Sequence, residues 1–309
     1  MTSLVEVATH LPPRVPLTTH GPVIGLTQVE TRRYRRGFGF EHICWDPELS
    51  ETDLMLAAAA GLAGLRGREH QVRYLIRART VRFPSPYPRS PLDDVRRALG
   101  LRQAQAFAVT EHACASGLLA VDLAGTLLDT DPLPDALALV LLGEKAFSKP
   151  AQLMPGVAVM GEAASAVLVS AEGAGDRVMS FTTRTVPLPN TGPCLNSDQY
   201  AMFGDIYPPA LADVVKSAVA SAGITLDDLA LILPHNVNAL SWVKTVKRLG
   251  LPLERVFLDN LPRMGHCFTA DPFLNYRTVT ESRLMRPGDY YAMTSVGLGA
   301  TFSAMVLQH

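Results

Sequence analysis

The residue that most directly suggests chemistry is Cys114, which lies in the stretch Ala113-Cys-Ala-Ser-Gly117. The apolar run 106–109 before it predicts a buried strand, and small apolar residues from Ala115 onward predict a buried helix. Small neighbours allow a strand to turn sharply into a helix and to present a nucleophile at the turn. The start of the helix would favour the thiolate, the reactive form of cysteine. These residues alone are equally consistent with an inert, buried cysteine.

Two histidines follow at positions where an imidazole could assist a thiol. His235 comes directly after an apolar strand, at the end where crevices open in α/β proteins. His266 follows Gly265 and precedes a predicted helix. Either histidine could instead make only loop hydrogen bonds. The glycine turn 297–299 joins two predicted strands and could aim backbone N–H groups at an anion, or be only a turn.

These residues must be positioned by strands and helices that alternate along the whole chain. Apolar runs predict strands at 3–8, 72–78, 106–109, 136–142, 164–170, near 178, and at 230–233, 290–295 and 301–307. Helices are predicted from 50 to 65 (with Thr52 as a candidate cap), at 92–99, from 115, and at 207–222, 238–249 and 269–285, the last with Pro272 in its first turn. Residues 11–50 and 143–163 are predicted to be irregular, and 83–91 a proline-dense loop. A turn-rich break at 171–176 divides two α/β halves, 1–172 and 173–309.

Composition excludes several classes of protein. The formal net charge is −1, and the chain has no basic run of the kind that binds nucleic acid. Its apolar stretches are shorter than the roughly 20 residues of a membrane span, and the first residues lack the basic region of a secretory signal. The four cysteines are far apart and form no CxxC pair, which argues against a zinc site or disulfides and for a reducing cytoplasm.

The order of these motifs resembles the condensing enzymes of the thiolase superfamily, and most of all ketoacyl-ACP synthase III. The resemblance is carried by Ala-Cys-Ala-Ser-Gly at 113–117, Pro-His-Asn-Val-Asn at 234–238, Gly-His-Cys-Phe-Thr-Ala at 265–270 and Gly-Leu-Gly-Ala-Thr at 297–301. The stretches beginning at His10, Arg36 and Gly161 extend it over nearly the whole chain. It implies a thiolase fold, in which two similar α/β halves form five layers, α-β-α-β-α.

The resemblance also implies roles for individual residues. Cys114 would take an acyl group from a thioester and hold it covalently. His235 would match the family's catalytic histidine, activating the thiol and hydrogen-bonding the donor carbonyl. The backbone N–H groups of Cys114 and Leu298 would form the oxyanion hole. No metal and no cofactor are implied beyond the substrate thioester, which would be an acyl-CoA or an acyl carrier protein.

One departure from the family's pattern bears on the reaction. His266 stands where the family has an asparagine. It could stabilise the enolate left when a malonyl thioester loses CO₂, as in elongating ketosynthases with two histidines. It could equally act as general base on an acceptor hydroxyl or amine. Asp271 could orient His266 or cap the following helix.

Other departures concern the thioester donor. The tryptophan that stacks on the CoA adenine in the family has no counterpart in residues 30–35, and Leu240 replaces an arginine. Three cations on the helix after His235 could form a footprint for an acidic carrier protein or simply a solvated helix face: Lys244, Lys247 and Arg248.

We therefore expect an enzyme of specialised, polyketide-like or fatty-acid-like metabolism that loads an acyl group onto Cys114 and condenses it with a malonyl-type thioester. One alternative is a non-decarboxylating acyltransferase that forms an ester or amide, and another is a non-catalytic partner subunit of a related synthase. The resemblance also implies a homodimer, or a heterodimer with a related subunit, formed through the first half. In such a dimer the loop 83–91 would reach the partner's acyl pocket.

Overall fold

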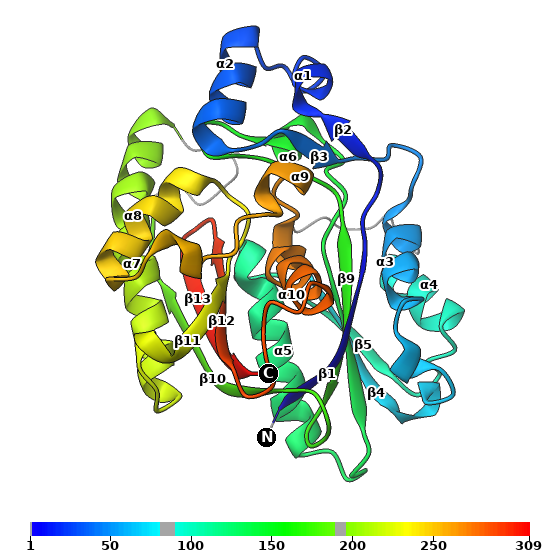
Figure 1. The fold of residues 1–309 in the computed structure, drawn as a ribbon. Coiled ribbons are helices and arrows are strands. Elements are labelled where there is room, and N and C mark those ends of the chain that lie inside the picture. Colours follow the sequence, from blue (N-terminus) through cyan, green and yellow to red (C-terminus); the bar gives the residue numbers. More distant parts are fainter. Residues whose placement is uncertain (1, 81–89, 189–195) are drawn as a thin grey trace.

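The computed structural model describes residues 2–80, 90–188 and 196–309. Its main β-sheet has nine strands and divides at the β1–β10 pair into two parts, which we call the first and the second sheet (Figure 1). The first sheet has the order β5-β4-β6-β9-β1, and its strands are Gln105–Val109, Val72–Ala78, Leu137–Leu142, Ala164–Ser170 and Ser3–His10. The second has the order β10-β13-β12-β11, and its strands are Asp176–Thr185, Thr301–Gln308, Tyr290–Gly297 and Leu229–Leu233. The sheets meet where β1 pairs with β10 through Ser3–Arg177 and Leu4–Asp176.

The two sheets repeat one strand order. Counted along the chain, the first sheet runs third, second, fourth, fifth, first. The second sheet follows the same order, with its third strand reduced to a bridge between Ile232 of β11 and Val256. This repeat makes the halves pseudo-symmetric. The division between residues 172 and 173 stays a prediction.

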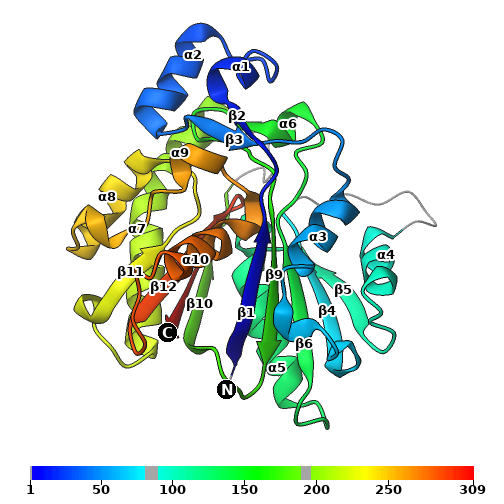
Figure 2. The same ribbon diagram turned by 45° about the vertical axis from the view of Figure 1, so that its right-hand side comes forward.

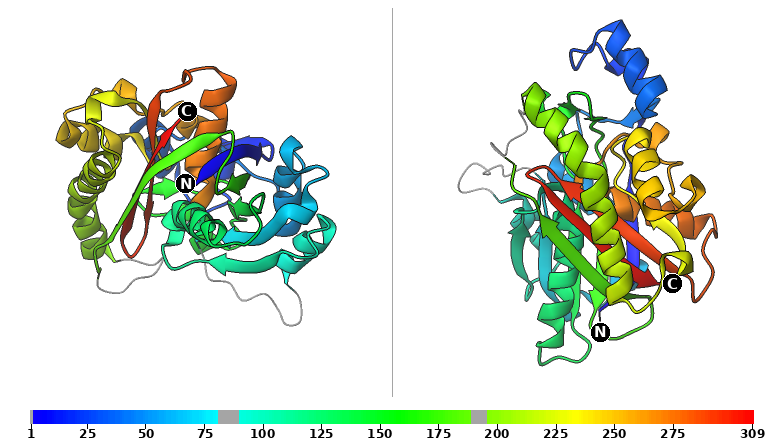
Figure 3. Two further views of the ribbon diagram at one scale, coloured as in Figure 1. Left: turned by 90° about the horizontal axis from the view of Figure 1, so that it is seen from below. Right: turned by 90° about the vertical axis from the view of Figure 1, so that its left-hand side faces the viewer.

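Helices cover both faces of both sheets and so produce the five expected layers (Figures 1 and 3). Between the sheets lie α5 (Ser116–Asp129) and α10 (Asp271–Glu281). The outer face of the first sheet carries α3 (Glu51–Ala59) and α4 (Pro91–Ala98), and that of the second carries α7 (Ser197–Ser221) and α8 (Ala239–Leu249).

The sequence of β6 shows why the layers form. Ala138, Val140 and Leu142 pack in the central cluster with α5 and α10, whereas Leu139 and Leu141 pack under α3. Side chains alternate between the faces of a strand, and a strand covered on both faces is therefore apolar throughout. The predicted strands 72–78 and 164–170 are likewise confirmed as β4 and β9.

The prediction that residues 11–50 are irregular is wrong. Short strands β2 (Arg14–Pro16) and β3 (His42–Cys44) pair with each other. Between them lie α1 (Leu17–His20), α2 (Gln28–Arg33) and a π-helical turn, and α1 and α2 project beyond the sheets in Figures 1 and 2. A capping box starts α2, because the Thr27 side chain accepts from Glu30 N while the Glu30 carboxylate accepts from Thr27 N. The proline and glycine residues on either side of α2 led to the prediction of an irregular segment, because they are typical of loops.

Two predicted helix starts need correction. The cap of α3 is Ser50 rather than Thr52, because Ser50 Oγ accepts a hydrogen bond of 3.1 Å from Asp53 N. Helix α7 begins ten residues before the predicted start at Tyr207, after an Asn196–Gln199 capping box. Its two prolines lie in the helix interior instead of the first turn.

Helix ends also differ from the predictions. Helix α3 stops at Ala59, and a separate 3₁₀ turn covers Ala63–Leu65. The predicted helix 269–285 is a 3₁₀ turn at Phe268–Ala270 followed by α10, with Pro272 in the first turn as predicted. The short helix α9 (Leu261–Met264) precedes this region.

Two further expectations fail in the first half. Strand β5 is at the edge of its sheet and largely exposed, not buried, because only β4 pairs with it. The expected loop 143–163 contains α6 (Lys149–Gln152) and the paired strands β7 (Leu153–Met154) and β8 (Ala158–Val159).

Some expectations concern residues outside those described, namely 83–89 of the proline-dense loop and Cys194. In the described part of the chain, every helix is too short or too polar to cross a membrane. Over the same residues, no group of three or more His, Cys, Asp and Glu is arranged to hold a metal ion.

Candidate functional site

Cys114 lies in a 3₁₀ turn, Ala113–Ala115, that leads into α5. Ala113 has a φ of 47°, in the left-handed region that side chains rarely adopt. The turn packs against Gly297 so closely that a Cβ there would lie 1.9 Å from the His112 carbonyl oxygen. The small residues at 113 and 297 therefore permit the sharp turn expected from the sequence.

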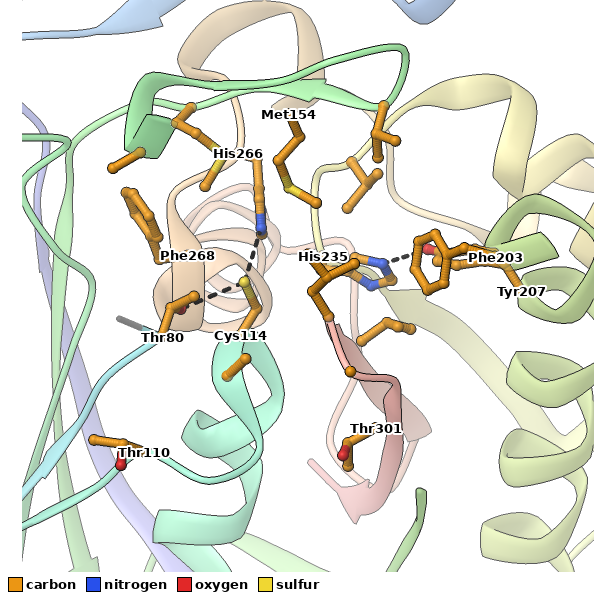
Figure 4. Close-up of a pocket in the computed structure, with 18 of the residues that line it drawn as sticks. Thr80, Thr110, Cys114, Met154, Phe203, Tyr207, His235, His266, Phe268 and Thr301 are labelled. Atoms are coloured by element: carbon orange, nitrogen blue, oxygen red, sulfur yellow. Dashed lines mark hydrogen bonds between the residues drawn. The ribbon is translucent and has the colours of Figure 1, made fainter. Parts of the chain in front are cut away.

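The sulfur of Cys114 is held between two side chains from distant parts of the chain (Figure 4). His266 Nε2 lies 3.2 Å from Cys114 Sγ, and Thr80 Oγ1 donates to Sγ at 3.4 Å. On the backbone side, Ser295 Oγ donates to the Cys114 carbonyl oxygen at 2.8 Å. The thiol is 5% exposed, yet it lines a cavity.

Behind His266 stands a buried carboxylate. His266 Nδ1 hydrogen-bonds Asp271 Oδ2, and Asp271 also accepts from the backbone N–H groups of Asn236 (2.6 Å) and Cys267 (2.7 Å). Burial alone would lower the pKa of His266, but the Asp271 carboxylate and the Cys114 thiolate raise it to about 10. Sulfur, imidazole and carboxylate thus form a hydrogen-bonded chain with the geometry of a catalytic triad.

The alternative role for Asp271 as a helix cap is wrong. The α10 helix has Ala270 at its N-cap, which makes no side-chain capping bond, and Asp271 is already the first helical residue. Both Asp271 oxygens point back to the loop that carries His266. Its second possible role, orienting His266, matches this geometry.

His235 lies at the end of β11 and lines the same cavity, with its ring centroid 6.4 Å from that of His266. Its Nε2 atom hydrogen-bonds Tyr207 Oη of α7 and not the sulfur. Burial lowers the pKa of His235 to about 3, with a smaller contribution from His266, so the ring is neutral. The structure therefore corrects the expectation that His235 is the histidine beside the thiol, because His266 occupies that place.

Leu298 lies in the turn between β12 and β13 and lines the cavity together with Cys114. This arrangement places both expected oxyanion-hole residues at the wall of one chamber. Their function as paired amide donors stays a prediction.

The cavity has a volume of about 850 Å³ and is lined largely by apolar side chains. A second cavity of about 360 Å³ lies beside it. The two share four lining residues: Val157, Phe203, Tyr207 and Val237. The second cavity is also lined by the exposed side chains of Arg33, Leu240 and Lys244. It therefore lies between the molecular surface and the chamber around Cys114.

The three cations considered as a carrier-protein footprint lie on α8. Lys244, Lys247 and Arg248 are all exposed, and Lys244 lines the second cavity. Leu240, which replaces the family's arginine, is 50% exposed on the same helix. Whether this face binds a carrier protein stays a prediction.

Sequence reasoning missed two residues of the site. Thr80 lies two residues after the end of β4, and its position at the carboxyl end of a strand was an available signal. Its backbone N–H donates to the buried carboxyl of Glu144, whose pKa burial raises to about 7 against the opposing charge of Arg77. Tyr207 gave no signal, because only the packing of α7 brings it to His235.

The chain is similar to known proteins in sequence and in fold. Residues 219–309 match the family model described as 3-oxoacyl-[acyl-carrier-protein (ACP)] synthase III C terminal. The beta-ketoacyl-[acyl-carrier-protein] synthase III of Roseiflexus castenholzii is 31% identical over 147 residues, which cover 46% of this chain and 44% of the relative. The first relatives are thus matched over less than half of their length. The Sphingopyxis alaskensis protein of the same name is 28% identical over 292 residues, 89% of this chain and 88% of the relative.

Solved structures match over almost the full length. The structure titled "ChlB3 [Aceyltransferase]" has a TM-score of 0.86 at 20% identity, covering 99% of this chain and 97% of its own. The 3-oxoacyl-[acyl-carrier-protein] synthase III of Aquifex aeolicus has a TM-score of 0.80 at 17% identity and full coverage of both chains. At these identities the likeness shows the fold. The chain therefore has the fold of these structures, and its sequence is similar to that of ketoacyl-ACP synthase III, with the family model matched over residues 219–309.

Proposed function

We propose that the protein is an acyltransferase that takes an acyl group from a thioester onto Cys114 and passes it to a hydroxyl or amine without loss of CO₂. The observation that carries this proposal is the hydrogen-bonded chain from Cys114 through His266 to Asp271. A sulfur nucleophile, an imidazole base and an orienting carboxylate are the parts that acyl transfer needs. The sequence had suggested this function as an alternative to decarboxylative condensation.

In the first half-reaction, the Cys114 thiolate attacks the carbonyl carbon of the donor thioester. The amides of Cys114 and Leu298 would stabilise the tetrahedral oxyanion. As the intermediate collapses, the carbon–sulfur bond to the donor breaks and the departing thiolate takes the proton from His266 Nε2. The products are acyl-Cys114, a free donor thiol and neutral His266.

In the second half-reaction, neutral His266 takes the proton of an acceptor hydroxyl or amine as that group attacks the acyl carbon. Cys114 leaves as a thiolate, and His266 is again an imidazolium. Asp271 stabilises this imidazolium in each cycle, and its buried hydrogen bonds to the backbone fix its position. The cycle needs no cofactor or metal.

The second cavity suits the arm of a thioester donor. It lies beside the chamber of Cys114 and is lined by the exposed Arg33 and Lys244. Lys244 continues on α8 into the exposed Lys247 and Arg248, a positive face that fits an acidic acyl carrier protein. No counterpart of the adenine-stacking tryptophan is present in residues 30–35, which favours the carrier protein over CoA as donor.

Decarboxylative condensation with a malonyl-type thioester is the second candidate. It is favoured by the presence of two imidazoles, those of His235 and His266, on the wall of one cavity with Cys114. In this reaction at least one imidazole would have to donate an N–H to the enolate oxygen. Their present hydrogen bonds to Tyr207 and Cys114 make acyl transfer the better-supported function.

Mass spectrometry of the intact protein with acyl-CoA and acyl-carrier donors tests the proposal. An adduct that is absent from Cys114→Ala but present in Cys44→Ala, a buried cysteine outside the cavity, supports covalent loading. The acyl-enzyme is then offered a panel of alcohols and amines, or a malonyl thioester with CO₂ detection. Product esters or amides without CO₂ are expected. CO₂-linked turnover would instead establish condensation, and no adduct with any donor would favour the non-catalytic subunit.

A further inference from the structure

The hydrogen bond between Tyr207 and His235 has no part in the transfer mechanism above, although it lies inside the reaction chamber (Figure 4). Tyr207 comes from α7 and His235 from the end of β11, so the bond joins two separate elements. Tyr207 also lines both cavities. Its hydroxyl therefore sits where a thioester entering the chamber would meet His235.

Packing holds this pair in place. The Tyr207 ring makes edge contacts with Phe203, at a centroid distance of 5.5 Å, and with Phe302, at 6.0 Å. The His235 ring packs against Trp242 at 6.1 Å. His235 is fully buried, and Tyr207 is 5% exposed. Neither ring can turn away without disturbing several aromatic neighbours.

Both partners are uncharged near neutral pH. Burial, and to a lesser degree Cys114, raises the pKa of Tyr207 well above its usual value, and burial lowers the pKa of His235 to about 3. A neutral imidazole carries one N–H, on Nδ1 or on Nε2. In the first tautomer Nε2 accepts from the phenol, and in the second it donates to the phenol oxygen. In either case, the Nε2 atom of His235 is engaged by Tyr207.

A decarboxylating reaction would need this nitrogen. When a malonyl thioester loses CO₂, the bond to the carboxyl carbon breaks and its electron pair moves into the thioester as an enolate. The enolate oxygen then requires N–H donors already aimed at it. The other imidazole, His266, contacts Cys114 through Nε2 and Asp271 through Nδ1. His235 is therefore the donor whose availability decides whether the enolate forms.

We propose that Tyr207 determines the specificity of the reaction: its hydroxyl occupies Nε2 of His235 and so denies that donor to a malonyl-type carbonyl oxygen. The inference rests on the proposed function, because it explains why Cys114, His266 and Asp271 transfer an acyl group without releasing CO₂. It assigns to Tyr207 a role separate from that triad.

The test is the release of CO₂ from a malonyl thioester alone, without an acyl donor, by the full-length protein. Tyr207→Phe removes only the hydroxyl and frees Nε2, and it should raise CO₂ release at least about tenfold over wild type, since one aimed donor changes such rates by roughly 10²–10³. The double variant Tyr207→Phe/His235→Ala should return to the wild-type rate. Tyr74→Phe is the matched control, because its hydroxyl also makes a hydrogen bond, to Asp131, and lies outside both cavities.

A folded Tyr207→Phe protein that releases no more CO₂ than wild type overturns the proposal. So does an increase that survives in the double variant, because the freed donor would then not be His235. If Tyr207→Phe does not fold, ¹⁵N NMR of the wild-type imidazoles replaces it. Adding a malonyl amide analogue should leave the His235 Nε2 resonance unmoved, and a shift would show that the carbonyl reaches it past Tyr207.

Failure of the proposed acyltransferase function would give results different from failure of the Tyr207 proposal. It would appear as a wild-type protein that never forms acyl-Cys114, or as an acyl-enzyme that reacts with no hydroxyl or amine. Neither result alters the CO₂ comparison between wild type and Tyr207→Phe, which needs no acyl donor.

Discussion

His266 Nε2 lies 3.2 Å from Cys114 Sγ, and the same ring is bonded through Nδ1 to the buried carboxylate of Asp271. An imidazolium held between a thiolate and a carboxylate can give its proton to a leaving thiol and recover one from an acceptor. We therefore expect the reaction to depend on His266, the position at which the sequence departs from the asparagine of the similar family.

Replacing His266 by asparagine should remove this proton carrier. We expect His266→Asn to slow acylation of Cys114 by about 10²–10⁴-fold, the usual contribution of a positioned acid–base group. The rate of adduct formation, followed by mass spectrometry, measures the effect. His70→Asn, at an exposed position away from the cavities, is the control. A His266→Asn protein that loads within about twofold of wild type would rule out His266 as the proton carrier.

The charge of Asp271 should make the free energy of unfolding depend on pH, because it stabilises protonated His266. The pKa of His266 is raised to about 10, so the stabilisation from its protonated form is fully present below pH 6.5 and is lost as the pH rises toward 10. Asp271→Asn keeps the size but removes the charge. We expect the loss in free energy of unfolding for Asp271→Asn to be largest near pH 6 and to shrink toward pH 10, measured in urea.

A constant offset should remain at every pH, because the amide cannot accept both backbone hydrogen bonds that Asp271 Oδ1 and Oδ2 accept. In a His266→Asn background, Asp271→Asn should leave the pH slope unchanged, since the two side chains act as one unit. Parallel stability curves for wild type and Asp271→Asn would contradict the assignment of this charge pair.

The sequence predicted Cys114 as the nucleophile and His235 as the histidine that activates it, whereas the structure places His266 beside the sulfur, and the reason is physical. Small residues around Cys114 are required by the turn itself, so they are visible in the local sequence. His235 and His266 both follow apolar segments and precede helices, so local pattern cannot rank them. Tyr207 distinguishes the two histidines, because it hydrogen-bonds Nε2 of His235. It is 28 residues from His235 in the chain and reaches it only through the packing of α7.

The wrong start predicted for α7 and the wrong position predicted for His235 are related, because both concern Tyr207. The helix predicted from Tyr207 would have its two prolines in the first turn, where proline is tolerated. The Asn196–Gln199 capping box instead starts the helix ten residues earlier and carries Tyr207 into its interior. By contrast, the strand predicted at 136–142 was correct to within one residue as β6, because a strand buried on both faces is apolar throughout.

The buried, neutral His235 should make the protein sensitive to acid. Its pKa is lowered to about 3, so below pH 6.5 the unfolded chain binds a proton that the native state does not. Wild type should lose about 1.4 kcal/mol per pH unit relative to a variant without this group. Urea unfolding of wild type and His235→Asn between pH 7 and 4.5 measures the difference. Curves that fall in parallel would show that His235 takes up a proton in the native state.

The turn that holds Cys114 should tolerate no side chain at Gly297. A Cβ there would lie 1.9 Å from the His112 carbonyl oxygen and 3.0 Å from the Ala113 Cβ, so the backbone around the nucleophile must shift. We expect Gly297→Ala to cost about 1–3 kcal/mol of unfolding free energy and to slow Cys114 acylation. Thermal unfolding and the loading rate measure the two effects. Gly37→Ala is the control, since a Cβ at Gly37 meets no atom within 4 Å. Normal loading by Gly297→Ala would show that the 112–114 turn can move without displacing the sulfur from His266.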